Sequence, residues 1–188
     1  MLTMNRAEAI SVSGDEIEIL APARTDFFID SSGGIEKGDA PFYFEKVEGD
    51  FTMRASVRPG FKKKYDAGGL FVLDSARKWI KLEFELTDLG YPSVVSVVTD
   101  GDSDDCNGES LAGRDEVHLQ VARKGDRWAL HYSLDGRSWR MVRYFRLKMK
   151  GAVRAGIEAQ SPVGSGCHVA YRGFTIADKA VKDMRKGR

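Results

Sequence analysis

Short segments in which apolar and polar residues alternate recur along most of the chain, and segments with helical periodicity are almost absent. Glu116 to Arg123 (EVHLQVAR) alternates cleanly, as a strand with one buried face does. Gly68 to Leu73 (GGLFVL) and Val94 to Thr99 (VVSVVT) are apolar and β-branched, which is typical of buried strands. Further strands are predicted at Glu16 to Leu20, Asp50 to Val57, Trp79 to Leu86, Arg127 to Ser133, Val142 to Leu147, Ala152 to Ala159 and His168 to Ile176.

Turn signals separate these segments. Asp135-Gly136 is a strong hairpin signal, and Lys124-Gly125-Asp126 forms another short turn. Many short strands joined by turns, without alternating helices, indicate an all-β antiparallel sandwich or barrel. No internal repeat or low-complexity linker interrupts the pattern, so we expect residues 1–188 to form one domain. The exception is the polar tail 177–188 (ADKAVKDMRKGR), which we expect to form one or two helical turns at most and to fray.

The predicted strand from Trp79 to Leu86 (WIKLEFEL) has an unusual polar face. Because side chains alternate along a strand, Trp79, Lys81, Glu83 and Glu85 share one side. This combination is odd for a core and more typical of a groove, in which Trp79 stacks on a sugar while Lys81 and Glu83 bind its hydroxyls. The alternative is a solvent-facing strand with hydrated charges, and alternation alone does not separate the two.

An Asp-rich segment follows this strand and its neighbour. It offers several oxygen donors within eight positions, namely Asp100, Asp102, Asp104, Asp105 and Asn107. Calcium takes six to eight oxygen ligands. The EF-hand template fails, however, because Asp105 stands where that loop has Gly, and Leu111 where it has Glu. We favour a loop whose side chains cap backbone amides, and a calcium site of another kind is the alternative.

Catalytic motifs are scarce. Asp66, in Tyr65-Asp66-Ala67-Gly68-Gly69, is either a binding or catalytic carboxylate or a turn residue. Glycoside hydrolysis needs two carboxylates, and Glu83 and Glu85 would lie about 6–7 Å apart on their strand. The E-x-D-x-x-E arrangement of laminarinase-like enzymes is absent. So are H-x-x-x-H metal spacing, the G-x-S-x-G elbow and the phosphate-binding loop.

Composition narrows the class of partner. The chain has 188 residues, 42% of them hydrophobic and 30% charged, with a formal net charge of +1. Such a charge favours neither nucleic acid nor an anionic membrane. No apolar run approaches the roughly 20 residues that span a bilayer, and no secretion signal is visible, so we expect a cytoplasmic protein. Cys106 and Cys167 fit no metal-binding spacing and are expected to be free thiols.

Several motifs in order carry a resemblance to a known family. They are Gly49-Asp50-Phe51, Tyr65 to Leu70 (YDAGGL), Trp79 to Glu85 (WIKLEFE), Val95 to Thr99 (VSVVT) and Ser103 to Gly108 (SDDCNG). Together they resemble an uncharacterised family of concanavalin A-like proteins that includes the "regulation of enolase" and YesU-type proteins, over roughly Asp26 to Ile176. The resemblance implies a jelly-roll sandwich of two antiparallel sheets, one of them concave.

The resemblance also implies where a site would lie. The polar positions that it matches are expected on and around the concave face, with the Asp-rich segment as the rim of a pocket: Asp66, Trp79, Lys81, Glu83, Ser96, Ser103, Asp104, Asp105, Asn107 and Gln160.

Three functions are open at this point. The leading hypothesis is a noncatalytic, carbohydrate-binding-like domain for a small sugar-like ligand, with Trp79 as the stacking platform and no metal or cofactor. The second is an enzyme that acts on a sugar or sugar acid, with Glu83 as general acid or base and Asp66 as its partner. The third is a regulatory domain whose same face binds a protein. The sequence does not indicate the oligomeric state.

Overall fold

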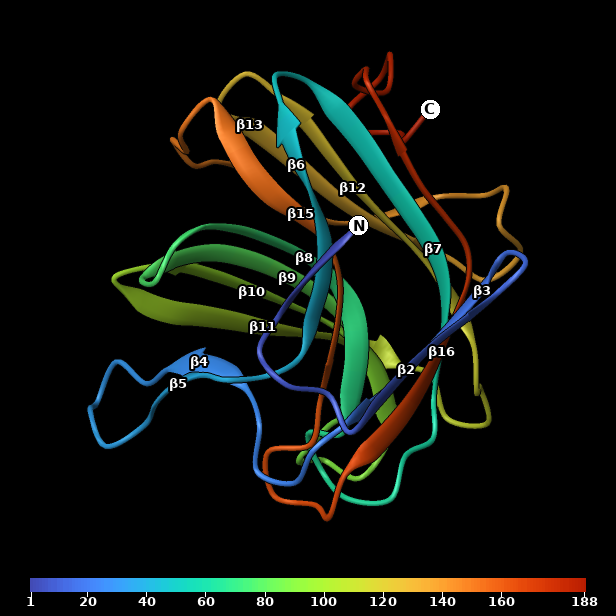
Figure 1. Ribbon diagram of the computed structural model, residues 1–188. Coiled ribbons are helices and arrows are strands. Elements are labelled where there is room, and N and C mark those ends of the chain that lie inside the picture. Colours follow the sequence, from blue (N-terminus) through green and yellow to red (C-terminus); the bar gives the residue numbers. More distant parts are fainter.

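The computed structural model describes residues 1–188 and shows a sandwich of two antiparallel sheets without any helix (Figure 1). No helical segment is therefore able to cross a membrane. The first sheet has the strand order β1 (Leu2–Met4), β6 (Phe42–Glu48), β15 (Ala152–Gln160), β8 (Ala67–Ser75), β9 (Lys78–Leu86), β10 (Pro92–Asp100) and β11 (Asp102–Ser110). The second has the order β14 (Arg140–Arg146), β13 (Arg127–Ser133), β12 (Val117–Lys124), β7 (Phe51–Pro59), β16 (Cys167–Ala177), β3 (Glu16–Ala21) and β2 (Ala9–Ser13). A separate hairpin joins β4 (Phe27–Ile29) and β5 (Glu36–Gly38).

The predicted all-β jelly-roll sandwich is confirmed. Every strand expected from alternation is present, with bounds that differ by at most two residues at either end. The pattern missed the short strands near the N-terminus, the β4–β5 hairpin, β6 and β11. Strand β11 was expected to be a loop because it is nearly all polar. It is the outermost strand of its sheet, where only one neighbour, β10, pairs with it and little apolar surface is required.

The main core lies between the two sheets. The apolar side of β9, with Ile80, Leu82 and Phe84, packs there together with Trp128 of β13 and Tyr171 of β16. Burial of each such side chain contributes on the order of 1.5–3 kcal/mol to folding. Because β9 turns this side inward, its other side, which begins with Trp79, is directed to the outer face of the first sheet.

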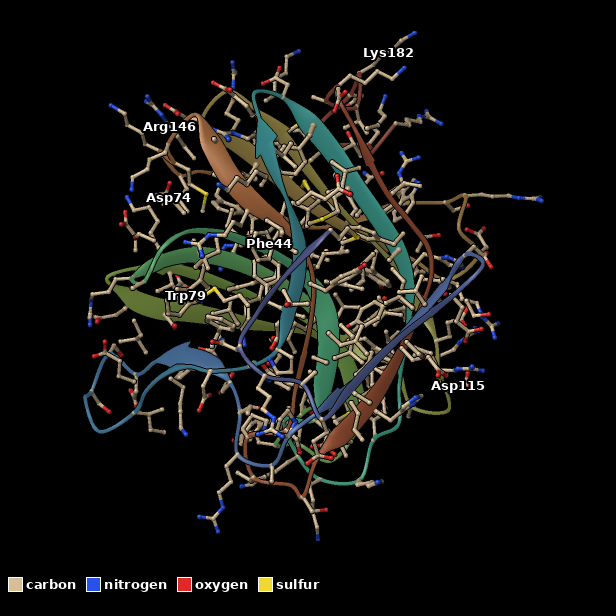
Figure 2. All side chains as sticks on the ribbon, in the orientation of Figure 1. Phe44, Asp74, Trp79, Asp115, Arg146 and Lys182 are labelled. Carbon is tan, nitrogen blue, oxygen red and sulfur yellow. The ribbon has the colours of Figure 1, made fainter.

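The β4–β5 hairpin covers part of that outer face. A second apolar cluster forms beneath it, in which the Trp79 ring (labelled in Figure 2) lies 5.7 Å from the Phe27 ring and 6.4 Å from the Phe71 ring. Phe42 and Phe44 of β6 complete this cluster. The hairpin thus divides the outer face into an apolar part, which it seals, and a polar part beside it.

The C-terminal tail covers the outer face of the second sheet, which corrects the expectation that it frays. Val181 and Met184 are buried against Ala122 of β12 and Ala129 of β13. The Thr52 hydroxyl also donates a hydrogen bond to a tail carbonyl, that of residue 179, at 2.8 Å. The tail was misjudged because its two buried apolar side chains are too few to give a periodic signal. They are enough to hold the tail in place because Ala122 and Ala129 offer a flat apolar surface.

Candidate functional site

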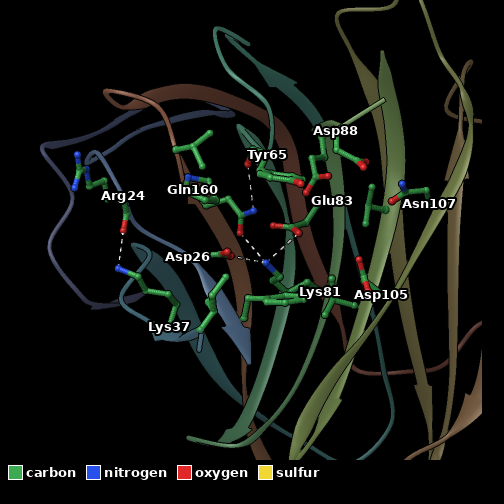
Figure 3. A pocket seen from close by; sticks show the side chains of 17 residues that line it. Arg24, Asp26, Lys37, Tyr65, Lys81, Glu83, Asp88, Asp105, Asn107 and Gln160 are labelled. Atoms are coloured by element: carbon green, nitrogen blue, oxygen red, sulfur yellow. Dashed lines mark hydrogen bonds and ion pairs between the residues drawn. The ribbon is translucent and has the colours of Figure 1, made fainter. Parts of the chain in front are cut away.

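A pocket of about 450 Å³ opens on the polar part of the first sheet's outer face (Figure 3). Its floor is formed by side chains of β9, β10 and β11, and Gln160 at the end of β15 extends it. Its walls come from the segment that enters the β4–β5 hairpin, from the hairpin itself and from the loops that carry Tyr65, Asp88 and Val163. The pocket therefore collects residues from both ends of the chain and from its middle.

Strand register explains which residues meet on the floor. In one row across the sheet, Glu158 of β15 lies beside Gly69 of β8, which lies beside Glu83 of β9. A Cβ at Gly69 would come within 2.8 Å of the Glu83 Cγ, so this position has to be glycine for Glu83 to adopt its place. The row continues through Val95 to Asn107 of β11.

Lys81 is the centre of the charged network in Figure 3 and is fully buried. Its Nζ lies 3.1 Å from an Asp26 carboxylate oxygen, 2.7 Å from the Gln160 carbonyl oxygen and 3.2 Å from a Glu83 carboxylate oxygen. Burial by itself would lower the pKa of Lys81, but the negative charges of Asp26 and Glu83 outweigh burial and raise it. Lys81 is therefore a permanent cation at the bottom of the pocket.

Carboxyl groups outnumber this cation. Burial, followed by the charge of Glu83, raises the pKa of Glu85 and that of Glu158 well above the ordinary value, so both carboxyls hold their protons to a higher pH than an exposed glutamate does. One carboxylate oxygen of Glu83 lies within ion-pair distance of Lys81, and the carboxyls of Glu83 and Glu158 are hydrogen-bonded to each other. The floor thus has more buried acceptor oxygens than protein donors.

The pocket brings together five of the residues predicted for a site. Lys81 and Glu83 lie on β9, Asp105 and Asn107 on β11, and Gln160 at the end of β15, and all five line the cavity. Three strands that are far apart in the sequence thus contribute to one surface.

Trp79 and Ser96 were predicted to line this surface and do not. Trp79 shares the outer face with Lys81 but is 1% exposed, because Phe27 of the β4–β5 hairpin covers it. Its indole therefore cannot stack on a ligand in this structure. Ser96 pairs in register with Leu82, a core residue, and so points into the sandwich rather than out of it.

Asp66 supports a loop and does not line the pocket. Its carboxylate accepts hydrogen bonds from the backbone amides of Lys62 and Lys63, each at 2.9 Å, and from the Ser161 hydroxyl at 2.7 Å. These three donors explain why a buried carboxylate is tolerated here, since they replace the water that it loses. The pairing of Asp66 with Glu83 as an acid–base couple is therefore wrong.

The Asp-rich segment forms the turn and the second strand of the β10–β11 hairpin rather than a loop. The chain turns at Gly101, which has a φ of 95°, and then runs back as β11. Side chains alternate along that strand: Asp104 pairs with Arg143 of the second sheet at 2.9 Å, whereas Asp105 faces the pocket. Ser103 holds the β4–β5 hairpin instead, because its hydroxyl accepts a hydrogen bond from the Ile29 amide at 3.0 Å. The segment's oxygens are thus directed to different places and do not converge on one ion.

Several pocket residues escaped the sequence analysis. Asp26, Phe28 and Tyr65 carry no local signal, since the first two lie in or beside a short hairpin and the third in a turn. Glu158 could have been predicted from the sequence, because it lies two positions before Gln160 on one strand and so shares its face.

Backbone conformation also marks the pocket. Three non-glycine residues have a positive φ, and two of these, Arg24 (63°) and Tyr65 (69°), line the cavity. Such conformations are costly for residues other than glycine, and their concentration around one pocket is typical of functional sites. The Tyr65 ring is one of two aromatic rings in the lining, the other being that of Phe28.

Fold and site together define a concanavalin A-like β sandwich with a polar pocket on the outer face of one sheet. Residues 3–179 match the model of a family described as "Protein of unknown function (DUF1349)", and the chain belongs to that family. This confirms the family resemblance noted in the sequence. A curated relative, "Regulation of enolase protein 1" of Saccharomyces cerevisiae, is 21% identical over 184 residues, which are 96% of this chain and 92% of the relative.

Solved structures give the same fold. A functionally unknown protein from Saccharomyces cerevisiae superposes with a TM-score of 0.89 at 20% identity, and 97% of each chain is covered. The GH43 protein BlXynB from Bacillus licheniformis gives 0.67 at 12% identity, with 87% of this chain and 33% of that chain covered. A legume lectin-like domain from Entamoeba histolytica gives 0.60 at 12%, with 94% and 89% covered. At these identities the likeness establishes the fold.

Proposed function

We propose that this protein binds a small carbohydrate or another hydroxyl-rich molecule in the pocket of the first sheet, without transforming it. The observation that carries this proposal is the lining of the cavity, where the side-chain oxygens of Glu85, Asp105 and Asn107 lack hydrogen-bond donors from the protein. A hydroxyl-rich ligand would supply those donors. The cavity's volume of about 450 Å³ is in the range of small-molecule sites.

The walls suit the carbon skeleton of such a ligand. Tyr65 and Phe28 present aromatic rings in the lining, and Ile35 and Val163 add apolar surface at the rim. Sugar rings have apolar faces as well as hydroxyls, so a polar floor beside aromatic walls matches both properties. In this proposal Tyr65 takes the stacking role that the sequence assigned to Trp79. The likeness of the fold to a lectin-like domain supports the same class of ligand.

A sugar panel tests the proposal. Melting temperature and calorimetric titration are measured with neutral, amino and acidic mono- and disaccharides, for the wild type and for Tyr65→Ala. We expect at least one sugar to bind the wild type and Tyr65→Ala to lose about tenfold in affinity, because one stacked ring contributes on the order of 1 kcal/mol or more. Tyr144→Ala, on the second sheet, is the control and keeps the affinity. The absence of any binding sugar would overturn the proposal.

One observation favours a second function, acid–base chemistry on a bound sugar. Glu83 and Glu85 are both in the pocket lining, about 6–7 Å apart along β9. Because burial and the charge of Glu83 raise the pKa of Glu85, this carboxyl is a proton donor beside an acceptor paired with Lys81. Release of nitrophenol from aryl glycosides, lost in Glu85→Gln, is the expected result for an enzyme. Equal release by both proteins would exclude it.

A regulatory function through a protein partner is less well matched. The family relative from Saccharomyces cerevisiae is named as a regulator of enolase. A protein-binding face would be broad and apolar, whereas this face is a pocket with a charged floor. We therefore place the small-ligand proposal first.

A further inference from the structure

The charge balance of the pocket floor bears on the chemical class of its ligand. Lys81 is the one buried cation there, and an ammonium group has three N–H donors. Asp26, Gln160 and Glu83 each place an oxygen within 3.2 Å of its Nζ. All three donors of Lys81 are thus directed to the protein itself. Lys81 holds the floor together and has no donor left for a ligand.

The carboxyl groups around Lys81 have more acceptor oxygens than Lys81 has N–H donors. Besides Asp26 and Glu83, the carboxyls of Glu85 and Glu158 lie in the same buried cluster. These groups have more oxygens than donors: Lys81 Nζ lies 3.2 Å from one Glu83 oxygen, and the carboxyls of Glu83 and Glu158 are hydrogen-bonded to each other. Glu83 lines the cavity but is 0% exposed, so its charge acts from beneath the surface, whereas Glu85, on the same face of β9, is 8% exposed.

Protons on Glu85 and Glu158 compensate for the shortage of cations around these buried carboxyl groups. Burial and neighbouring negative charge raise the pKa of Glu85 and of Glu158, which favours the protonated form of both carboxyls. A cluster that must take up protons to be tolerated has a deficit of cations. A bound cation would remove that deficit directly.

The two other cations of the lining, Arg24 and Lys37, lie on the side of the pocket away from Glu83 and Asp105 (Figure 3). Lys37 reaches the pocket but donates to the Arg24 carbonyl at 3.1 Å and lies 3.6 Å from Asp39, outside the cavity lining. On the opposite side, Asp88 and Asp105 add two further carboxylates, and neither has an ion-pair partner. The negative charge therefore extends from the floor to one wall.

We infer that the ligand of this pocket carries a protonated amine, in the manner of an amino sugar, and that its ammonium group binds between Glu83 and Glu85. The inference rests on the proposed function and narrows it from hydroxyl-rich molecules in general to those with a cationic nitrogen. Tyr65 and Phe28 contact the carbon skeleton, and their ring faces also attract a cation. The ammonium donates to the Glu85 carboxyl at the cavity surface, and the negative charge of Glu83 beneath it attracts the cation.

Matched sugars test the inference by calorimetric titration at pH 7. The probes are glucosamine and galactosamine, their neutral parents glucose and galactose, and the N-acetyl derivatives, in which the amine is blocked and uncharged. We expect the free amines to bind at least tenfold more tightly than both other groups. Glu83→Gln should abolish this preference, and Glu45→Gln, an exposed position on β6, should retain it.

Each outcome has one meaning. Equal affinity for the three groups of sugar overturns the amine inference and leaves the proposed function in place. If neither these sugars nor any other sugar of the panel binds, the amine inference and the proposed function are both overturned. If Glu83→Gln fails to fold, Glu85→Gln serves instead, because Glu85 is less deeply buried than Glu83 and lies at the cavity surface. Retention of the full amine preference in the variant that folds overturns the inference.

Discussion

The two outer faces of the sandwich bury polar side chains in different ways. On the second sheet, Gln120 receives a hydrogen bond from Arg54 Nε at 2.6 Å and donates one to the Gly187 carbonyl of the C-terminal tail at 3.2 Å. On the first sheet, the carboxyls of Glu83 and Glu158 have more oxygens than donors. One face is closed by the chain's own end, and the other is open to a molecule from outside.

The difference teaches how a structural polar cluster can be told from a binding site. A buried acceptor without a donor costs on the order of 1–3 kcal/mol, so a protein tolerates it only where something else compensates. The two faces also respond to pH in opposite directions. Burial lowers the pKa of His131 under the tail, so its contribution to stability is lost as the pH falls below about 6.5. The raised pKa of Glu158 makes the first face lose stability as the pH rises.

The largest expected effect comes from removing the cation of the pocket floor. Lys81→Met leaves the carboxylates of Asp26 and Glu83 buried without a counter-charge, so the free energy of unfolding should fall by about 3–5 kcal/mol. Urea denaturation at pH 7 measures it. Lys37→Met, a partly exposed lysine at the mouth of the same pocket, should cost less than about 1 kcal/mol. Similar losses in both variants would contradict the assigned role of Lys81.

A smaller effect is expected from loosening the closed face. Met184→Ala removes a side chain that the tail buries against Ala122 and Ala129, and should lower the free energy of unfolding by about 2 kcal/mol. Ligand affinity in the pocket should not change, since the tail lies on the other sheet. The exposed Met141→Ala is the control, with little effect expected. No loss in Met184→Ala would mean that the tail frays after all.

The smallest effect is a gain of stability that depends on pH. The folded state holds a proton on Glu158 that the unfolded state releases above about pH 4.5, so wild-type stability falls as the pH rises from there toward the raised folded pKa. Glu158→Gln removes this loss. The variant should therefore be more stable than the wild type at pH 8 and match it near pH 4.

Urea denaturation at pH 4, 6 and 8 measures this difference, and Glu45→Gln on the exposed surface should show none. A Glu158→Gln variant that is less stable than the wild type at pH 8 would show that Glu158 is ionised and stabilising. It would then resemble Gln120 of the second face, whose side chain is hydrogen-bonded to Arg54 and Gly187.

Much of the pocket floor could be predicted from the sequence. Alternation along β9 placed Lys81 and Glu83 together on the face opposite Leu82, and the structure has them so. Ser96 was placed on that face by the resemblance and not by alternation, and its pairing with the core residue Leu82 shows that this placement was wrong. Asp66 was misjudged because its carboxylate accepts hydrogen bonds from the backbone amides of Lys62 and Lys63 in its own loop. No pattern of side chains along the sequence reveals such backbone contacts.

The sequence by itself determined the strands, their faces and the excess of carboxyl groups on one of them, because alternation depends only on neighbouring residues. Only the tertiary structure decided what covers each face. Asp26 and Gln160 reach Lys81 across 55 and 79 positions of chain, and the hairpin that seals Trp79 leaves Glu83 uncovered. Whether an outward-facing residue becomes core or binding site depends on these distant segments, whose contacts no local pattern records.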